Sequence, residues 1–191
     1  MLEIRIHGRG GQGAVIASKL LAHAAMLEGQ FSQSFPAFGG ERRGAPVVAY
    51  VRIDDKKIRR RYQIYEPDCV VVLDSKLLKM VNPTEGLRKG ATVIVNGNPE
   101  ELPAAYSEFD LFSIDASSIS REFGLGPRNA PIVNTSILGA VVKATGVVKL
   151  DTLIDAIQEG VPFRKEENVK AAKEAYKSVI SVRIGKEGDP S

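Results

Sequence analysis

The chain has 191 residues, of which 43% are hydrophobic and 26% are charged, and its formal net charge is +3. This length suits one domain, and the balance of 26 basic and 23 acidic residues argues against a dedicated nucleic-acid-binding protein. One cysteine cannot form an internal disulfide or supply the four thiolates of an iron–sulfur cluster, and it fits a reducing cytoplasm. We expect no membrane span and no signal peptide, because the apolar runs are too short and the N-terminus reads directly into a strand.

The first part of the chain predicts a strand, a glycine-rich turn and a helix. Apolar and charged side chains alternate over residues 2–6, which is typical of a strand. The glycines of residues 7–13 follow, and residues 14–27 are rich in Ala and Leu without a helix breaker. Residues 30–35 predict a second strand, so these segments are expected to form a βαβ unit.

An irregular loop is predicted next, over residues 36–46, with three glycines and two prolines. Long loops without regular structure in compact domains tend to be functional. This loop would leave the carboxyl end of the second strand, where ligands and partners bind in open α/β sheets. It contains Phe38 and Arg42, of residue types that are enriched at protein interfaces.

The remaining elements complete an α/β pattern. The apolar run at residues 69–73 predicts a central strand with Cys69 buried in it. Further strands are expected at 47–53, 91–95 and 111–114, with an antiparallel return at 56–65. Helices are expected at 75–81, 134–145, 150–159 and 166–179, and a frayed tail at 185–191. The pattern predicts a single domain over residues 1–184. We expect a three-layer α/β/α Rossmann-like sandwich with a mostly parallel sheet and a helical C-terminal part.

The glycine turn matches the G-x-G-x-x-G pattern between a strand and a helix. Such glycines let a ligand approach the backbone, and the helix N-terminus favours a phosphate. The carboxylate that holds the ribose in dinucleotide-binding domains is missing, because Glu28 lies at the helix end before the second strand. The turn is therefore either a ligand site or a means of packing the helix closely against the strand.

Two motifs in order resemble the gamma subunit of 2-oxoacid:ferredoxin oxidoreductases. They are His7-Gly8-Arg9-Gly10-Gly11-Gln12-Gly13 and Phe35-Pro36-Ala37-Phe38-Gly39-Gly40-Glu41-Arg42-Arg43-Gly44-Ala45-Pro46. The likeness continues through residues 66–68, Asp74 and residues 134–140, and so covers nearly the whole chain. The second motif is more similar to pyruvate-type members than to 2-oxoglutarate-type ones.

The resemblance implies a place in a multisubunit enzyme. In that family a 2-oxoacid is oxidatively decarboxylated to acyl-coenzyme A with thiamine diphosphate and magnesium, and [4Fe–4S] clusters pass the electrons to ferredoxin. The gamma subunit packs against alpha, beta and delta-type subunits and helps to shape the coenzyme A approach. By this resemblance the isolated chain is inactive and binds none of these cofactors alone. We expect that exposed patches meant for partners let the isolated chain form a homodimer.

The resemblance also implies the site residues, which are carried over by position. The expected cofactor-binding residues are Gly8, Arg9, Gly10, Gly11, Gln12, Gly13, Asn134 and Thr135, and the expected partner-interface residues are Phe38, Glu41, Arg42 and Arg43. Arg42 or Arg43 would also be available to an anion. No catalytic and no metal-binding residue is expected in this chain.

Three interpretations stay open at this point. The main alternative to a complex subunit is a stand-alone NAD- or nucleotide-binding α/β protein. His7, at the end of the first strand, could face a ligand or fix the turn. The basic run at residues 56–61 is either a solvated face or a docking surface for the coenzyme A ribose phosphate or an acidic partner.

Overall fold

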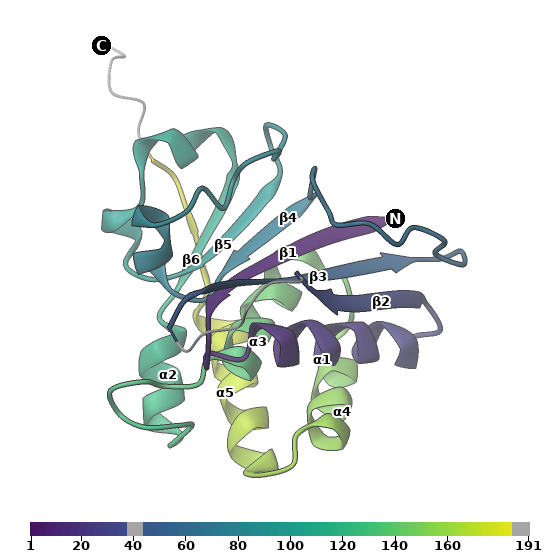
Figure 1. Cartoon of the computed structure of the whole chain (residues 1–191). Helices are drawn as coiled ribbons and strands as arrows, with labels where there is room; N and C mark the ends of the chain where they lie inside the picture. Colours follow the sequence, from purple (N-terminus) through teal and green to yellow (C-terminus); the bar gives the residue numbers. More distant parts are fainter. Residues whose placement is uncertain (38–43, 185–191) are drawn as a thin grey trace.

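A computed structural model describes residues 1–37 and 44–184, which form an α/β fold around one seven-stranded sheet (Figure 1). The strands are β1 (Leu2–Arg9), β2 (Phe31–Pro36), β3 (Pro46–Asp54), β4 (Cys69–Val72), β5 (Thr92–Asn96), β6 (Asp110–Ile114) and β7 (Ile180–Val182), in the order β2-β3-β1-β4-β5-β6-β7. The central strands β1, β4, β5 and β6 are parallel neighbours. Antiparallel pairing adds β3 and β2 at one edge and β7 at the other. The α/β class is therefore confirmed, and the parallel part lies at the centre of the sheet.

The expected βαβ unit differs in one respect from the observed topology. Helix α1 (Ala14–Leu27) has the predicted bounds, but β2 does not lie beside β1. Strand β3 lies between them, because it returns antiparallel to both and pairs along the whole of β1, from Leu2 opposite Ile53 to Arg9 opposite Pro46. The nine residues of β3 satisfy an edge of β1 that would otherwise be open.

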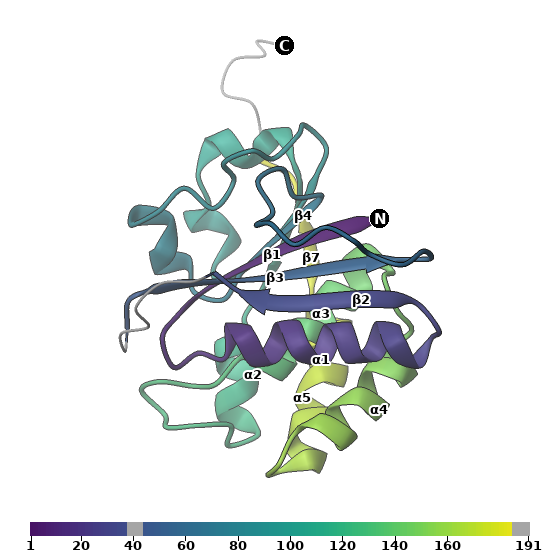
Figure 2. The same ribbon diagram turned by 45° about the vertical axis from the view of Figure 1, so that its right-hand side comes forward.

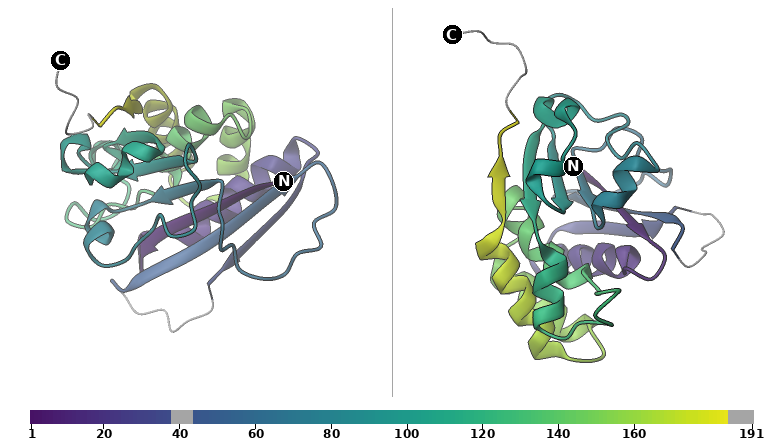
Figure 3. Two further views of the ribbon diagram at one scale, coloured as in Figure 1. Left: turned by 90° about the horizontal axis from the view of Figure 1, so that it is seen from above. Right: turned by 90° about the vertical axis from the view of Figure 1, so that its left-hand side faces the viewer.

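The two faces of the sheet are covered by different kinds of helix (Figures 2 and 3). One face carries α1, α2 (Ala116–Glu122), α3 (Asn134–Thr145), α4 (Leu150–Gly160) and α5 (Lys165–Ser178). The other carries the 3-10 helices η1 (Ser75–Lys79), η2 (Pro99–Glu101) and η3 (Ala104–Glu108). Strand residues alternate between these layers, since Val71 and Ile94 join the α-helical core whereas Val70 and Val93 join the second cluster. None of the helices in the described residues is long and apolar enough to cross a membrane.

Strand β4 is buried along its whole length, as predicted for a central parallel strand. Cys69 begins it, and its thiol is inaccessible to solvent. Burial, followed by the nearby charge of Asp68, raises the pKa of this thiol to about 12. Cys69 is thus a core residue, which confirms the prediction from the sequence.

Several predicted elements were wrong or missing. The short helix expected at residues 75–81 is present as the 3-10 helix η1, which ends at Lys79, whereas residues 56–65 form no strand. Residues 56–61 within this segment include five cations, and apolar residues do not alternate along it. Hydrogen bonds from the side chains of Gln33 and Arg52 hold the segment in place of strand pairing. The sequence analysis also missed α2 and β7. Helix α2 has a readable signal, because the Asp115 carboxylate accepts the N–H of Ser118 at 2.8 Å as an N-cap.

Helices α3 and α5 approach each other closely because Gly139 has no side chain. A Cβ at this position would overlap the backbone carbonyl of Ala172 in α5. Both residues are buried in the α-helical core. A backbone atom cannot move aside as a flexible side chain can, so the position requires glycine.

We predict that Gly139→Ala destabilises the fold by about 1–3 kcal/mol through overpacking, although helix propensity alone would favour alanine by up to about 1 kcal/mol. Thermal unfolding checks this, with Tm expected to fall by about 2–4 °C per kcal/mol. Lys170→Ala, on the exposed side of α5, serves as the control and should leave Tm nearly unchanged. A Tm equal to or above that of the wild type for Gly139→Ala would disprove the close packing.

Candidate functional site

The carboxyl ends of the four parallel strands open into a cleft of about 960 Å³. After β1 the chain adds β2 and β3 on one side of it and then β4 on the other side, so the order in which strands are added reverses between β1 and β4. Ligands of open α/β sheets bind at such a point. The lining includes Arg9, Gly10, Gly11 and Gln12 after β1, Asp74 and Lys76 after β4, Asn96 and Asn98 at the end of β5, and Asp115 and Arg121 after β6.

The glycine turn is held in shape by its own hydrogen bonds. The Gly10 N–H donates to the Ala45 carbonyl at 2.9 Å, and the Gly44 N–H donates to the Gly10 carbonyl at 3.1 Å. Within the turn, the Gln12 N–H donates to the Arg9 carbonyl at 2.9 Å, and the Arg9 N–H donates to Gln12 Oε1 at 2.8 Å. The turn therefore extends the β1–β3 ladder and presents a fixed backbone to the cleft.

Asp74 joins the glycine turn to the end of β4. Its Oδ2 accepts a hydrogen bond from Gln12 Nε2 at 3.0 Å and lies 3.5 Å from Arg9 Nε. Its Oδ1 accepts the N–H of Lys76 at 3.0 Å and so caps η1. One carboxylate thus positions two of the predicted site residues and starts the next element.

Polar residues at the carboxyl ends of β5 and β6 complete the wall of the cleft, and the sequence did not predict them as site residues. Asn96 Nδ2 donates to the Leu73 carbonyl at 2.8 Å and to Ser117 Oγ at 2.9 Å, while its Oδ1 accepts the Ser117 N–H at 3.2 Å. Ser113 Oγ donates to the Gly97 carbonyl at 2.6 Å. A buried asparagine at the end of an apolar strand was the available signal, because buried amides are normally bonded.

The structure separates the predicted glycines into two groups. Gly8 and Gly13 serve packing: a Cβ on Gly8 would press on Leu73 and Ala14, and one on Gly13 would lie 2.8 Å from Asn134 Nδ2. Arg9, Gly10, Gly11 and Gln12 line the cleft. The packing interpretation therefore applies to Gly8 and Gly13, and the ligand-site interpretation stays a prediction for the residues that line the cleft.

The other predicted residues lie in different surroundings. Asn134 lines a smaller pocket of about 390 Å³ and not the main cleft. Thr135 is buried, and its hydroxyl donates to Asn168 Oδ1 at 2.6 Å. Their cofactor role remains a prediction that the fold does not test. The predicted interface residues Phe38, Glu41, Arg42 and Arg43 lie outside the described residues.

His7 is buried next to the turn, with 7% of its surface exposed, and does not line the cleft. Desolvation, helped by the charge of Arg5, lowers the pKa of its imidazole to about 3. Its Nε2 has no hydrogen-bond partner within residues 1–37 and 44–184. His7 is therefore neutral at ordinary pH, and its role in fixing the turn stays a prediction.

The sequence matches the family model described as pyruvate ferredoxin/flavodoxin oxidoreductase over residues 3–178. The chain belongs to this family. It is 52% identical over 189 residues to the pyruvate/ketoisovalerate oxidoreductases common subunit gamma of Thermococcus litoralis, covering 94% of this chain and 98% of the relative. It is 48% identical over 181 residues to the pyruvate synthase subunit PorC of Methanocaldococcus jannaschii, covering 94% and 98%.

A solved structure agrees with the sequence relatives. The pyruvate oxidoreductase subunit PORC of Thermotoga maritima superposes with a TM-score of 0.77 at 33% identity, covering 94% of this chain and 97% of that one. The chain is therefore of the gamma-subunit type, as the two motifs indicated. It covers 97–98% of the length of these subunits.

The cleft is equipped to bind and orient a polar ligand. Three cations line it, Arg9, Lys76 and Arg121, together with the carboxylates Asp74, Glu101 and Asp115. Its remaining lining is rich in hydroxyl, amide and backbone groups. In the described part of the chain no three His, Cys, Asp or Glu side chains gather as a metal site would require.

We predict that Gly13→Ala costs more stability than Gly11→Ala. Both glycines have positive φ, 85° and 98°, so each alanine incurs about 1 kcal/mol of backbone strain. Only at Gly13 would the new Cβ also collide with Asn134, since nothing lies within 4 Å at Gly11. We expect the second effect to add about 1–2 kcal/mol, measured by urea unfolding. Asn134→Ala in the Gly13→Ala background should recover part of it, and equal losses for both glycines would contradict the packing role of Gly13.

We predict that His7 makes stability fall in acid. Its pKa is about 3 in the folded chain, against an ordinary value of 6.5 for histidine, so the unfolded state takes up the proton first. The contribution of neutral His7 is complete above pH 6.5 and is lost between pH 6.5 and about 3. At about pH 5 this amounts to roughly 2 kcal/mol.

His7→Phe should remove this dependence. The measurement compares urea unfolding of the wild type and the variant at pH 7 and pH 5, so that the titration of carboxylates, common to both, cancels. If the difference in unfolding free energy between the two proteins does not change with pH, His7 is not buried in its neutral form.

Proposed function

We propose that this chain is the gamma subunit of a thiamine-diphosphate-dependent, pyruvate-type 2-oxoacid:ferredoxin oxidoreductase that forms acyl-coenzyme A in the cytoplasm. The observation that carries the proposal is an identity of about half the residues, over nearly the full length, to gamma subunits of enzymes named for pyruvate. By the same proposal, alpha, beta and delta-type subunits are its partners, and ferredoxin takes the electrons from the complex. Phe38, Glu41, Arg42 and Arg43 are proposed as contacts to these partners.

The composition of the chain supports a division of labour within the complex. Bound thiamine diphosphate supplies the carbanion chemistry for decarboxylation, with magnesium holding the diphosphate and [4Fe–4S] clusters carrying electrons. The only cysteine, Cys69, is buried and its thiol pKa is about 12, so it is unsuited to ligate a cluster. We therefore assign these groups to the partner subunits.

The role proposed for this chain is to shape the approach of coenzyme A. The cleft at the β1–β4 reversal offers a fixed glycine backbone and the cations Arg9, Lys76 and Arg121, a combination that suits the phosphates of coenzyme A. A stand-alone NAD-binding protein is less well supported, because β2 reads Phe-Ser-Gln-Ser-Phe-Pro and ends without the carboxylate that would hold the ribose.

The test is purification of the tagged chain from its native host, followed by assay with pyruvate, coenzyme A and ferredoxin. We expect thiamine-containing and cluster-containing subunits to accompany it. Recovery of the chain alone in an active, NAD-binding form would favour the alternative.

We predict that Arg9→Ala in the assembled enzyme raises the apparent KM for coenzyme A by about tenfold, the usual effect of losing one charge-assisted contact. The KM for pyruvate should stay the same. Lys89→Ala, an exposed cation outside the cleft, is the matched control. An unchanged coenzyme A KM in a fully assembled Arg9→Ala enzyme would remove Arg9 from this role.

A further inference from the structure

A strongly basic segment crosses the sheet face that lies opposite the α-helices. We call residues 55–65, between β3 and β4, the basic strap. It contains five cations and one carboxylate, a surplus of four, whereas the whole chain has a net charge of only +3. All five cations are exposed: Lys56, Lys57, Arg59, Arg60 and Arg61. Five of the 26 basic residues of the chain are thus gathered in one short segment.

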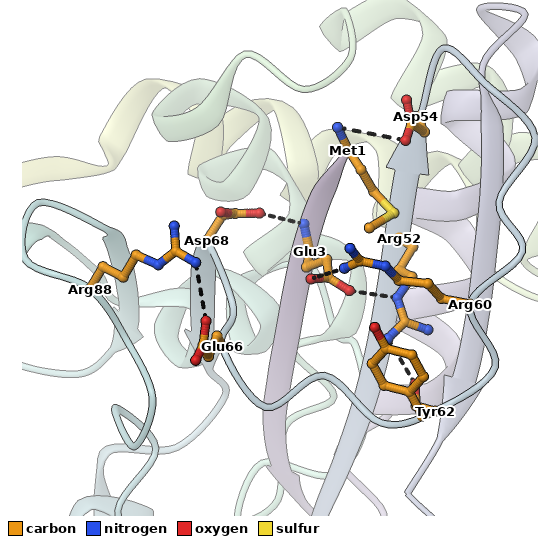
Figure 4. Close-up of polar contacts among 9 residues, drawn as sticks. All are labelled: Met1, Glu3, Arg52, Asp54, Arg60, Tyr62, Glu66, Asp68 and Arg88. Atoms are coloured by element: carbon orange, nitrogen blue, oxygen red, sulfur yellow. Dashed lines mark hydrogen bonds and ion pairs between the residues drawn. The ribbon is translucent and has the colours of Figure 1, made fainter.

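The strap is fixed to the sheet by a buried arginine (Figure 4). The Arg52 guanidinium stacks between two rings, 5.3 Å from the Phe35 centroid and 5.2 Å from the Tyr62 centroid. It also donates to the Tyr62 carbonyl at 2.7 Å and to Glu3 Oε1 at 2.6 Å. Ile64 adds a buried apolar anchor. The cations are therefore presented on a preformed frame, which lowers the entropy cost of binding.

Most of the positive charge of the strap is not neutralised by neighbouring carboxylates, because these carboxylates bind other groups. Glu3 pairs with Arg52 and with Arg60, the latter at 3.3 Å. Three further acidic neighbours are engaged as Figure 4 shows: Asp54 with the Met1 amino group, Asp68 with the Glu3 N–H, and Glu66 with Arg88. Asp55 is the one carboxylate within the strap itself, against its five cations. Within the described residues, Lys56, Lys57, Arg59 and Arg61 form no ion pair.

The surroundings of these cations are those of a protein interface. Tyr62 and Tyr65 are 54% and 66% exposed beside them, and tyrosine with arginine is typical of the centres of protein–protein contacts. The carboxylates of Asp55 and Glu66 lie within or next to the strap in sequence. A protein surface with an acidic centre and a rim of mixed charge complements this arrangement of cations, tyrosines and carboxylates.

The strap lies at the opposite end of β1 from the cleft. Arg9, which lines the cleft, pairs with the first residue of β3, whereas Leu2 pairs with Ile53, just before the strap begins. The eight residues of β1 span about 25 Å. A macromolecule can therefore contact the strap without occupying the cleft, and the cations of the strap are poorly placed for a ligand held there.

We propose that the basic strap is a docking surface for an acidic face of another subunit of the oxidoreductase. This rests on the proposed function, and it adds to it the location and the charge of one interface. The two tyrosines anchor the interaction, and the surrounding cations contribute electrostatic attraction. Because salt screens this attraction, the affinity depends on ionic strength.

The test measures binding of the chain to the remaining subunits of the complex, purified together. The variant is Lys57→Glu/Arg59→Glu/Arg61→Glu, and the matched control is Lys165→Glu/Lys170→Glu/Lys173→Glu on exposed positions of α5, with the same change in charge. At about 50 mM salt we expect the strap variant to weaken the Kd by at least about tenfold, and the difference to shrink at about 500 mM salt. The control should stay within about twofold of the wild type.

The possible outcomes are distinguishable. If the wild-type chain binds no such subunits, the proposed function fails, and this inference fails with it. If the wild type binds and the strap variant binds equally well, or the control weakens binding as much, only the inference is overturned. Salt-dependent retention of the wild type on double-stranded DNA, lost in the strap variant, would overturn the assignment to a protein partner. Thermal unfolding should show both triple variants folded, because all six positions are exposed.

Discussion

The pairing of β1 with β3 on one side and with β4 on the other is the constraint on which the rest of the structure depends. The antiparallel bond to β3 continues into the glycine turn, where Gly10 and Ala45 extend the ladder. The parallel bond to β4 brings Asp74 to the same edge, where it holds Arg9 and Gln12. Strand β1 therefore lies at the point where the strand order of the sheet reverses. Its two neighbours fix the loops that line the cleft at this point.

The same strand divides the molecule into two polar regions of different character. At its carboxyl end the cations are balanced by carboxylates and amides, which suits the orientation of a small polar ligand. At its amino end the side chains of Glu3 and Arg52 hold a segment whose charge is nearly all positive. A fold with both regions can serve as a connector, with a ligand at one end of β1 and a partner at the other.

The sequence predicted elements with a strong periodic or compositional signal, and it failed where side chains replace periodicity. Helix α1 and the buried strand β4 follow from Ala and Leu content and from an apolar run. The insertion of β3 between β1 and β2 could not be predicted, because pairing partners at long sequence separation leave no local pattern. For the site, the motif located Arg9 and Gln12, whereas Asn96 was missed because its role depends on contacts with Leu73 and Ser117.

The position of Cys69 has a practical consequence for measuring the dynamics of this subunit. The thiol is the only one in the chain, and it lies between Ile4 of β1 and Thr92 of β5 in the centre of the sheet. Its side chain packs in the α-helical core, so a thiol reagent can reach it only when that core opens, and the labelling rate reports this opening and not the fraying of an edge. The natural sequence thus contains its own single-site probe. Comparing the labelling rate of the free chain with that of the assembled chain would measure how much the partners stabilise the centre of the sheet.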